Sequence, residues 1–232
     1  MVKYKATKRA KFISRPNRFI AKVILDGNIE TVHVKNTGRC KELLTEGCDV
    51  VLYESDKPSR KTKYDLVAVY KHRKDSLPLL INMDSQIPND VVDEWLKKGR
   101  LFERDAVIRR EVVFGDSRFD FYVRDGDRKA FIEVKGVTLE EDRIAKFPDA
   151  PTERGVKHIN ELVSAVKLGY EAYVIFVIQM KEIDLFTPND ATHKAFGDAL
   201  RAAASQGVGV IALDCIVSED TIEADGYVPI EL

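Results

Sequence analysis

The sequence predicts an α/β protein, α+β overall, in which a small β-barrel is followed by a layered α/β domain. Residues 19–82 contain short strand-like segments separated by turns, and residues 89–217 alternate between helical and strand patterns. The balance of charge also changes sign between the two halves of the chain. We expect the first domain to span residues 1–84 and the second 85–232, and a chain of 232 residues can bury a real hydrophobic core.

The predicted barrel rests on segments that are rich in Val, Ile and Tyr. Asp26-Gly27-Asn28 is a good hairpin turn between the first two segments. Several short strands in so small a region favour a closed barrel, which leaves no exposed sheet edge. The five expected strands are 19–25, 29–35, 49–55, 64–71 and 79–82.

The second half predicts helices and strands in alternation. Residues 152–168 form an amphipathic pattern in which Ile159, Leu162 and Val163 belong to one stripe. Residues 172–178 are apolar throughout, which is typical of a central strand covered on both faces. The expected helices are 89–104, 152–168 and 191–205, and the expected strands are 111–114, 117–123, 130–135, 172–178 and 208–217.

Composition narrows the class of protein. No run approaches the ~20 apolar residues of a membrane helix, and no apolar segment follows the basic start as it would in a secretory signal. Cys40, Cys48 and Cys215 show no CxxC pairing, so we expect reduced thiols in a cytoplasmic protein and no zinc site. We expect no membrane contact and infer no obligate protein partner, and the sequence leaves the oligomeric state open.

Charge is distributed unevenly along the chain. Residues 1–80 hold 18 Lys and Arg against 9 Asp and Glu, a net of +9, and the remaining residues hold 19 against 29, a net of −10. A basic half is a plausible phosphate-binding surface. A basic domain docked on an acidic one, without a ligand, explains the same numbers equally well.

A hairpin between residues 117 and 135 carries the side chains that could take part in catalysis. Alternation over its two strands separates an apolar face from a polar one. The apolar face is expected to hold Phe119, Phe121, Val123, Ala130, Ile132 and Val134, and the other face Arg118, Asp120, Tyr122, Phe131, Glu133 and Lys135.

The register of this hairpin places like charges together. With the turn centred on Gly126-Asp127, Asp120 lies opposite Glu133 and Arg118 opposite Lys135. Directly opposed Cβ atoms are ~4.5–5.5 Å apart, and two carboxylates at that distance repel each other. A divalent cation offsets this cost, and hard oxygen ligands of this kind suit Mg²⁺ or Mn²⁺.

Lys135 adds a positively charged side chain to the predicted site. A lysine beside a metal-bound carboxylate can orient a water or stabilise charge on a phosphate undergoing attack. Asp120, Glu133 and Lys135 are therefore the candidate catalytic residues for metal-assisted phosphodiester hydrolysis. In a hairpin taken at random, a solvated charged face with local ion pairs is the more common arrangement.

Five segments resemble one known family. They are SRFDF at 117–121, EVKGVTL at 133–139, FPDAPTERGVKH at 147–158, NTGR at 36–39 and RKT at 60–62. On these motifs the chain resembles the sugar fermentation stimulation protein A family along nearly its whole length. The resemblance implies a DNA-binding protein linked to regulation of sugar (maltose) metabolism, with an OB-like barrel followed by a PD-(D/E)XK restriction-endonuclease-like domain.

The nuclease signature is met with one departure. Phe119-Asp120 stands where a Pro-Asp pair is expected, whereas Pro148-Asp149 follows the Glu133-Val134-Lys135 segment and is not that motif. Related nucleases often add an upstream glutamate. The resemblance therefore makes Glu111 a candidate metal ligand beside Asp120 and Glu133, with Glu103 as the weaker choice.

Further residues are candidates for accessory roles. Thr152 is a natural N-cap, and a helix N-terminus that faces the site would favour phosphate. Arg154 and His158 share a helix face, where they would touch a phosphate or water, or form only local salt bridges and caps. We expect His158 to be a hydrogen-bonding partner rather than a metal ligand. The accessory set is Arg118, Asp149, Glu153, Arg154, His158 and Gln179.

The basic barrel is the expected nucleic-acid surface. OB folds bind single strands through basic and aromatic residues, although Lys-rich loops are also common on solvated surfaces. No segment resembles a recognition helix, so backbone contacts to DNA are expected. The candidate contacts are Arg39, Arg60, Lys61, Lys63, Arg73 and Lys74.

Two functions from different classes fit these observations. The first is a Mg²⁺- or Mn²⁺-dependent nuclease with Asp120, Glu133 and Lys135 at its centre. The second is a DNA-binding regulator on a nuclease scaffold that does not cleave. A metabolic enzyme or sugar-binding module is a third option, for which the sequence offers no sugar site.

Overall fold

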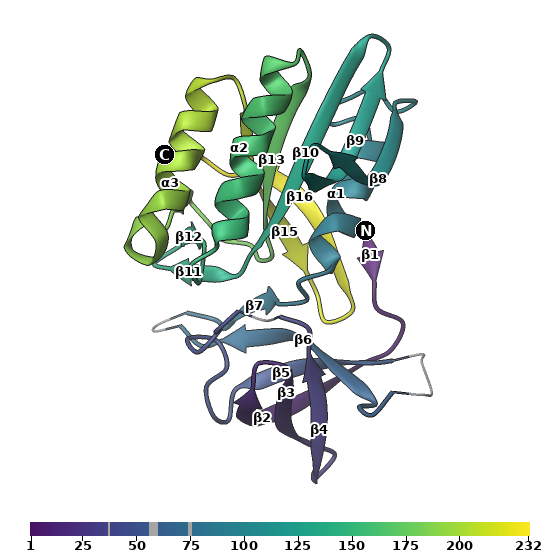
Figure 1. Cartoon of the computed structure of the whole chain (residues 1–232). Helices are drawn as coiled ribbons and strands as arrows, with labels where there is room; N and C mark the ends of the chain where they lie inside the picture. Colours follow the sequence, from purple (N-terminus) through teal and green to yellow (C-terminus); the bar gives the residue numbers. More distant parts are fainter. Residues whose placement is uncertain (37, 56–59, 74–75) are drawn as a thin grey trace.

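The barrel and the layered domain are both present, one above the other (Figure 1). The computed structural model describes residues 1–36, 38–55, 60–73 and 76–232. The first domain is a six-stranded sheet in the order β4-β3-β2-β5-β6-β7, and a parallel pairing of β4 with β6 closes it into a five-stranded OB-like barrel. Its strands are β2 (Thr7–Asn17), β3 (Ile20–Leu25), β4 (Asn28–Val34), β5 (Asp49–Glu54), β6 (Tyr64–Lys71) and β7 (Leu79–Asn82).

The barrel has five strands as predicted, but one of them differs from the prediction. β2 was not expected, because the stretch TKRAKFISRPN is too basic to read as a strand, whereas β7 extends the sheet beside β6 and lies outside the closed barrel. β2 buries Ala10 and Phe12 and leaves Lys8, Arg9 and Lys11 exposed. Strand pairing therefore overrides composition at this position.

The second domain is built on a seven-stranded sheet in the order β1-β16-β15-β13-β10-β9-β8. β10, β13 and β15 are parallel neighbours, and β9 and β8 extend the sheet antiparallel. A small three-stranded sheet, β11-β12-β14, lies beside it. The strands are β1 (Val2–Lys3), β8 (Val107–Phe114), β9 (Ser117–Asp125), β10 (Arg128–Val137), β11 (Leu139–Glu141), β12 (Ile144–Phe147), β13 (Glu171–Ile178), β14 (Leu185–Pro188), β15 (Gly209–Val217) and β16 (Thr221–Tyr227).

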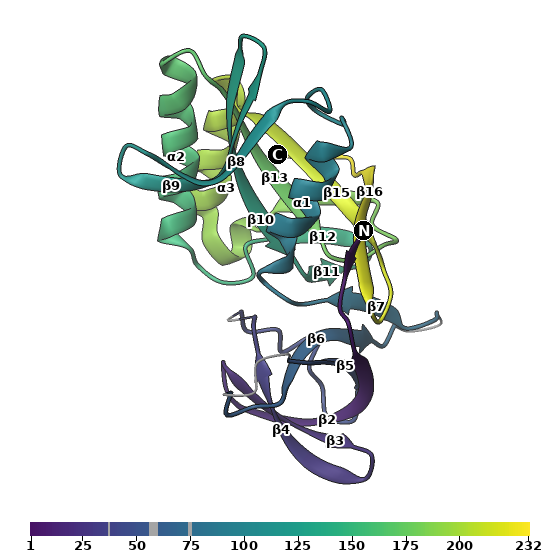
Figure 2. The same cartoon turned by 90° about the vertical axis from the view of Figure 1, so that its right-hand side faces the viewer.

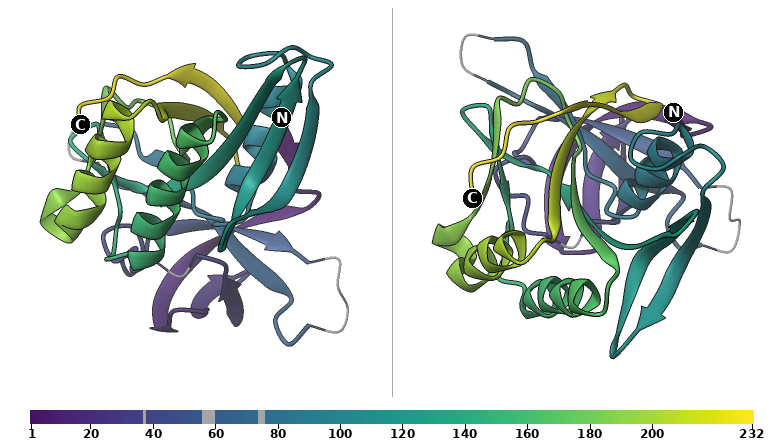
Figure 3. Two further views of the ribbon diagram at one scale, coloured as in Figure 1. Left: turned by 45° about the horizontal axis from the view of Figure 1, so that its top comes forward. Right: turned by 90° about the horizontal axis from the view of Figure 1, so that it is seen from above.

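Helices cover both faces of the large sheet (Figures 2 and 3). α2 (Glu153–Lys167) and α3 (Asp190–Ser205) pack together on one face, and α1 (Ile87–Lys97) packs on the other. Alternate residues of β13 enter the two layers: Phe176 joins the core under α2, and Val177 the core under α1. This is the doubly covered central strand expected from its unbroken apolar run.

Three local predictions are corrected by the structure. The helix expected over 89–104 ends at Lys97, where Gly99 follows with a φ of +74°. Phe119 does not share a face with Phe121; its ring packs 5.4 Å from that of Phe131. The short strands β1, β11, β12 and β14, and the longer β16, were not predicted, because brief segments give little periodic signal.

Two strands join the domains. β1 pairs antiparallel with β16, so the first residues of the chain belong to the second domain's sheet. At the other contact, the Asn82 N–H of β7 donates to the Gln179 carbonyl just after β13, at 2.9 Å. No helix within the described part of the chain combines the length and apolarity needed to cross a membrane.

Candidate functional site

The β9–β10 hairpin has the predicted register. Asp125 lies opposite Arg128 and Phe121 opposite Ile132. The regular ladder then stops, and the Val134 N–H donates to Asp120 Oδ2 at 2.7 Å instead of to a carbonyl. The Asp120 side chain therefore occupies the place where the two strands separate.

Asp120 is held between two donors. Its other oxygen, Oδ1, accepts from Asn89 Nδ2 of α1 at 2.8 Å. Burial, followed by the negative charge of Glu133, raises the pKa of Asp120, and the bonds from Val134 and Asn89 only partly oppose this. The repulsion expected between the two carboxylates is therefore present in the fold.

Glu133 on β10 is almost fully buried, with 3% of its surface exposed. Its Oε1 accepts from Lys135 Nζ at 2.6 Å and lies 2.5 Å from His158 Nδ1 of α2. Burial alone would raise the pKa of Glu133, but the His158 hydrogen bond and the Lys135 charge outweigh it and lower this pKa. Glu133 is thus ionised beside a carboxyl group that resists ionisation.

The second oxygen of Glu133 differs sharply from the first. Glu133 Oε2 is buried and has no hydrogen-bond partner among the residues described. An unsatisfied buried carboxylate oxygen is costly, and a divalent cation removes that cost. Asp120 and Glu133 therefore fit a hard cation such as Mg²⁺ or Mn²⁺. No group of three or more His, Cys, Asp or Glu in the described part could hold a metal, so further ligands would be other oxygen atoms or water.

α2 orients Glu133. Thr152 is its N-cap as predicted, and accepts from the Gly155 N–H at 3.0 Å. Arg154 Nε donates to His158 Nε2 at 3.3 Å, so Nδ1 of the neutral ring carries the proton that His158 donates to Glu133. His158 is 5% exposed and serves as the hydrogen-bonding partner that the sequence suggested.

Three other candidates lie apart from this cluster. Glu111 has a φ of +57° and pairs at the surface with Arg118, at 2.7 Å. Among the described residues it makes no three-ligand group with Asp120 and Glu133, and its expected ligand role stays a prediction. Because the ladder ends before Asp120, Arg118 is not paired with Lys135. Glu153 is exposed, and its carboxylate lies 3.2 Å from His193.

Gln179 and Asp149 lie where the two domains meet. Gln179 is 1% exposed, and its Nε2 donates to Asn82 Oδ1 and to the Asp84 carbonyl, each at 3.0 Å. Asp149 lies against Gly38 of the barrel. Both residues are thus part of the domain junction rather than of the carboxylate pair.

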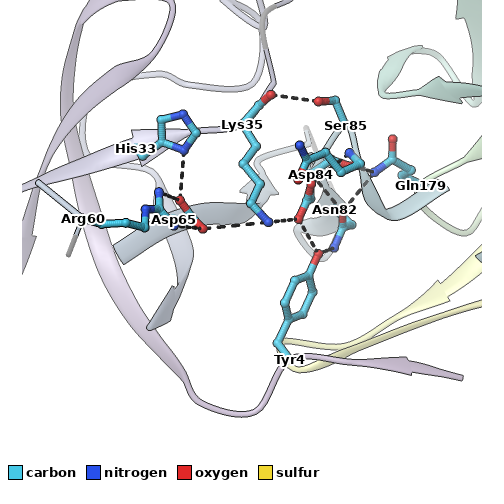
Figure 4. A network of polar contacts seen from close by, with 10 residues as sticks. Tyr4, His33, Lys35, Arg60, Asp65, Asn82, Asp84, Ser85 and Gln179 are labelled. Carbon is cyan, nitrogen blue, oxygen red and sulfur yellow. Dashed lines mark hydrogen bonds and ion pairs between the residues drawn. The ribbon is translucent and has the colours of Figure 1, made fainter. Parts of the chain in front are cut away.

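A buried polar network continues from Gln179 into the barrel (Figure 4). Lys35 Nζ donates to Asp84 Oδ2 at 2.8 Å and lies 3.8 Å from Asp65 Oδ2. Asp65 also accepts both arms of the Arg60 fork and contacts His33 Nδ1 at 2.9 Å. Burial alone would raise the pKa of Asp65, but the bonds from Arg60 and His33 and the Lys35 charge lower it.

The candidate nucleic-acid residues divide into bound and free cations. Arg60 is engaged with Asp65, Lys63 pairs with Glu54 at 3.1 Å, and Arg73 pairs with Glu182 at 2.8 Å. Arg39 and Lys61 are exposed, and their side chains have no partner in the described residues. Lys74 lies outside the described residues.

Comparisons with known proteins agree with this architecture. Residues 86–221 match the family model described as the sugar fermentation stimulation protein RE domain, and residues 13–77 match the SfsA N-terminal OB domain. The chain belongs to the sugar fermentation stimulation protein family. The two matched segments lie on either side of the domain division predicted at residues 84 and 85, a position that itself stays a prediction.

Relatives in this family are similar over the full chain. A sugar fermentation stimulation protein homolog of Desulfitobacterium hafniense (strain Y51) is 59% identical over 231 residues, covering 100% of this chain and 99% of the relative. The homolog of Ruminiclostridium cellulolyticum is 54% identical, with both chains covered completely. The solved structure of Pyrococcus furiosus SfsA in complex with Ca²⁺ has a TM-score of 0.87 at 26% identity, covering 100% of this chain and 98% of that one.

Sequence reasoning missed Asn89 and the junction residues Tyr4, Asn82 and Asp84. Asn89 directly follows Pro88, and such a residue at a helix start reads as part of a cap rather than as a ligand holder. Asp84 directly after the β7 pattern was the available signal for the junction, since a carboxylate that ends a buried strand needs a partner.

Proposed function

We propose that the chain is a cytoplasmic DNA-binding protein that holds a divalent cation on Asp120 and Glu133 and hydrolyses phosphodiester bonds. The observation that carries this proposal is the buried Glu133 Oε2, which has no partner in the described residues beside a second carboxylate. In support, the related Pyrococcus furiosus SfsA was solved in complex with Ca²⁺.

The residues around Glu133 have distinct roles in this proposal. When bound, a Mg²⁺ or Mn²⁺ ion would acidify a water and offset phosphate charge. Lys135, whose ammonium lies 2.6 Å from Glu133 Oε1, would orient that water or stabilise the charge of the phosphate under attack. His158 fixes the Glu133 carboxylate, and Arg154 both holds His158 and offers its remaining donors to a phosphate.

Calorimetric titration of Mn²⁺ and Mg²⁺ tests the cation site. The wild-type protein should bind Mn²⁺. The Asp120→Ala and Glu133→Gln variants should each bind Mn²⁺ much more weakly or not at all. Asp127→Asn, an exposed carboxylate in the turn of the same hairpin, is the matched control and should bind as the wild type does. Absence of binding by the wild-type protein at millimolar metal would refute the proposed site.

A cleavage assay tests the chemistry separately. Labelled single-stranded and duplex DNA should be cut in Mn²⁺ and spared in chelator, and Lys135→Ala should lower the rate by about 10²-fold or more. Lys129→Ala removes an exposed lysine from the same strand and should not affect the rate. Equal rates for these two variants would remove Lys135 from the mechanism.

The second candidate is a non-catalytic DNA-binding regulator of genes for sugar metabolism. The net charge of +9 over residues 1–80 and the unpaired Arg39 and Lys61 favour it. It predicts DNA binding that weakens steeply with added salt and persists in Glu133→Gln, with no cleavage under any metal. Cation-dependent DNA cleavage by the purified wild-type protein would exclude a non-catalytic regulator.

A further inference from the structure

A small polar pocket lies between the barrel and the second domain. We call it the junction pocket and define it by Asn36, Ser85, Gly136, Thr138, Asp149 and Gln179, which line it. Its volume is about 100 Å³, which corresponds to about three waters. Gly136 directly follows Lys135, so the pocket begins beside the proposed catalytic residues. It also brings Asn36 of the NTGR segment together with Asp149 of the FPDAPTERG segment.

Gln179 presents an acceptor to this pocket. Its Nε2 donates to Asn82 Oδ1 and to the Asp84 carbonyl, which are both acceptors. The amide orientation is therefore fixed, and Oε1 is left to face Gly136, where an added Cβ would lie 2.6 Å from it. A glycine at position 136 is what leaves room for this carbonyl oxygen.

Asp149 adds a negatively charged acceptor. Its carboxylate has no hydrogen bond or ion pair within the described part of the chain, although it lines the pocket. The cation in the lining, Lys146, is engaged by Glu141 at 2.5 Å. Asn36 Oδ1 is used by the Gly38 N–H at 2.8 Å, which leaves the Asn36 amide N–H groups as donors. The pocket thus combines two strong acceptors with donors that include the Asn36 amide and the Thr138 hydroxyl.

The barrel wall of the pocket is rigidly held. Arg15 donates to the carbonyls of Asn36, Gly38 and Arg39 at 2.6–2.9 Å. Gly38 approaches Asp149 so closely that an added Cβ would lie 2.1 Å from its Oδ2. The described residues of this wall are therefore held in place before a ligand binds.

We propose that the junction pocket receives the amine-bearing edge of one unpaired nucleobase, so that the protein acts on single-stranded nucleic acid. The inference rests on the proposed function and names its substrate class. The amine would donate to Asp149 and Gln179 Oε1, and a ring nitrogen or carbonyl would accept from Asn36. Thymine places a carbonyl where the amine would lie, and the carboxylate repels it. A volume of about three waters admits the amine-bearing edge of one base, and in a duplex that edge is already engaged by the paired base.

Fluorescence anisotropy with labelled oligo-dC, oligo-dT and a duplex of equal length tests this inference, with Ca²⁺ as the cation. Oligo-dC should bind about tenfold more tightly than oligo-dT, and more tightly than the duplex. Asp149→Asn should abolish the preference for oligo-dC. Asp142→Asn, an exposed carboxylate outside the pocket, should retain it.

The outcomes separate this inference from the function on which it rests. Binding without base preference, a preference unchanged in Asp149→Asn, or tighter binding of the duplex would overturn the pocket assignment and leave the nuclease proposal standing. Binding to no nucleic acid would overturn both.

A second measurement uses the wild-type protein alone and so does not depend on how Asp149→Asn folds. The probe is 2-aminopurine, which bears an amine and becomes fluorescent when it leaves the base stack. Scanned through a single strand that is held in register by one duplex end, it should brighten at one position. Uniform fluorescence along the strand would contradict the pocket.

Discussion

The two carboxylate oxygens of Glu133 have different environments, and the proposed cation site depends on this difference. Oε1 is shared by Lys135 and His158, whereas Oε2 is buried without a partner in the described residues. One oxygen therefore fixes the carboxylate, and the other remains available to a cation. A solvated carboxylate on a strand would show neither property.

Asn89 should matter for cation affinity although it is not a ligand in the proposed site. Asn89→Ala removes the donor to Asp120 Oδ1 and with it one of the bonds that lower the Asp120 pKa. We expect Mn²⁺ affinity to fall about tenfold, because a hydrogen bond to a charged group contributes about 1.5–3 kcal/mol. Calorimetry measures this change. Asn160→Ala, an exposed change on α2, serves as the control and should leave the affinity unaltered.

Asp65 should stabilise the barrel in a pH-dependent way. Its pKa is lowered in the fold, so its contribution is present above the unfolded pKa of about 3.9 and is lost as the pH falls through the lower folded value. Asp65→Asn should lower the free energy of unfolding by about 3 kcal/mol at pH 7. Urea denaturation from pH 7 to pH 3 should show this deficit shrinking below about pH 4. A deficit that does not vary with pH would contradict the assignment.

At the residue scale, the sequence predicts the candidate catalytic side chains better than the residues that hold them in place. Alternation and the turn at Gly126-Asp127 are enough to place Asp120 near Glu133. They cannot place Asn89, which is 31 residues from Asp120 and meets it only through the packing of α1. Glu111 was named from the resemblance alone, and its positive φ could not be read from its residue type.

Among the elements, β9 and β10 show how a side chain can end a ladder. The Asp120 carboxylate takes the Val134 N–H, and the alternation of faces changes at the same place, so that Phe119 packs with Phe131. Alternation predicts faces only along regular extended backbone, and β8 departs from it opposite Asp120, where Glu111 has a φ of +57°. The apolar face predicted from the sequence therefore held for Phe121 and Ile132 and failed at Phe119.

Gly136, near the end of β10, should not tolerate even the methyl side chain of alanine. In Gly136→Ala the new Cβ would lie 2.6 Å from Gln179 Oε1 and 2.9 Å from Pro88 Cγ, and Gln179 cannot turn without losing two hydrogen bonds. We expect the free energy of unfolding to fall by about 1–3 kcal/mol in urea. At Gly226 an added Cβ would come no closer than 3.4 Å to other atoms, so Gly226→Ala should cost much less. Equal costs would contradict the crowding.

At the scale of the whole molecule, a buried set of polar contacts joins the two domains, beside exposed ion pairs such as Arg73–Glu182. Tyr4, Asn82, Asp84 and Gln179 link β1, β7 and the end of β13 into one hydrogen-bonded junction (Figure 4). Burial and the charge of Asp84 raise the pKa of Tyr4 far above its usual value, so its hydroxyl remains a donor. The sequence predicts two domains of opposite charge, but not this junction, because its members are distant along the chain.

Asp84 should couple the unfolding of the two domains. Asp84→Ala leaves Lys35 without its closest carboxylate, and we expect a loss of about 2 kcal/mol in the free energy of unfolding. Fluorescence of the single tryptophan, Trp95, reports on the second domain, and hydrogen exchange of β2 to β6 reports on the barrel. The two probes should share one urea midpoint in the wild-type protein and separate in Asp84→Ala. They should stay together in the exposed control Asp105→Ala. Coincident midpoints in Asp84→Ala would show that the domains are coupled elsewhere.

The pairing of β1 with β16 has a consequence for the order of events during synthesis. A ribosome makes β1 among the first residues of the printed chain and β16 among the last, so β1 has no partner until translation is nearly finished. The barrel can fold as it emerges, whereas its attachment to the large sheet through β1 must wait. The link between the domains that β1 and β16 make is therefore completed only in a nearly finished molecule.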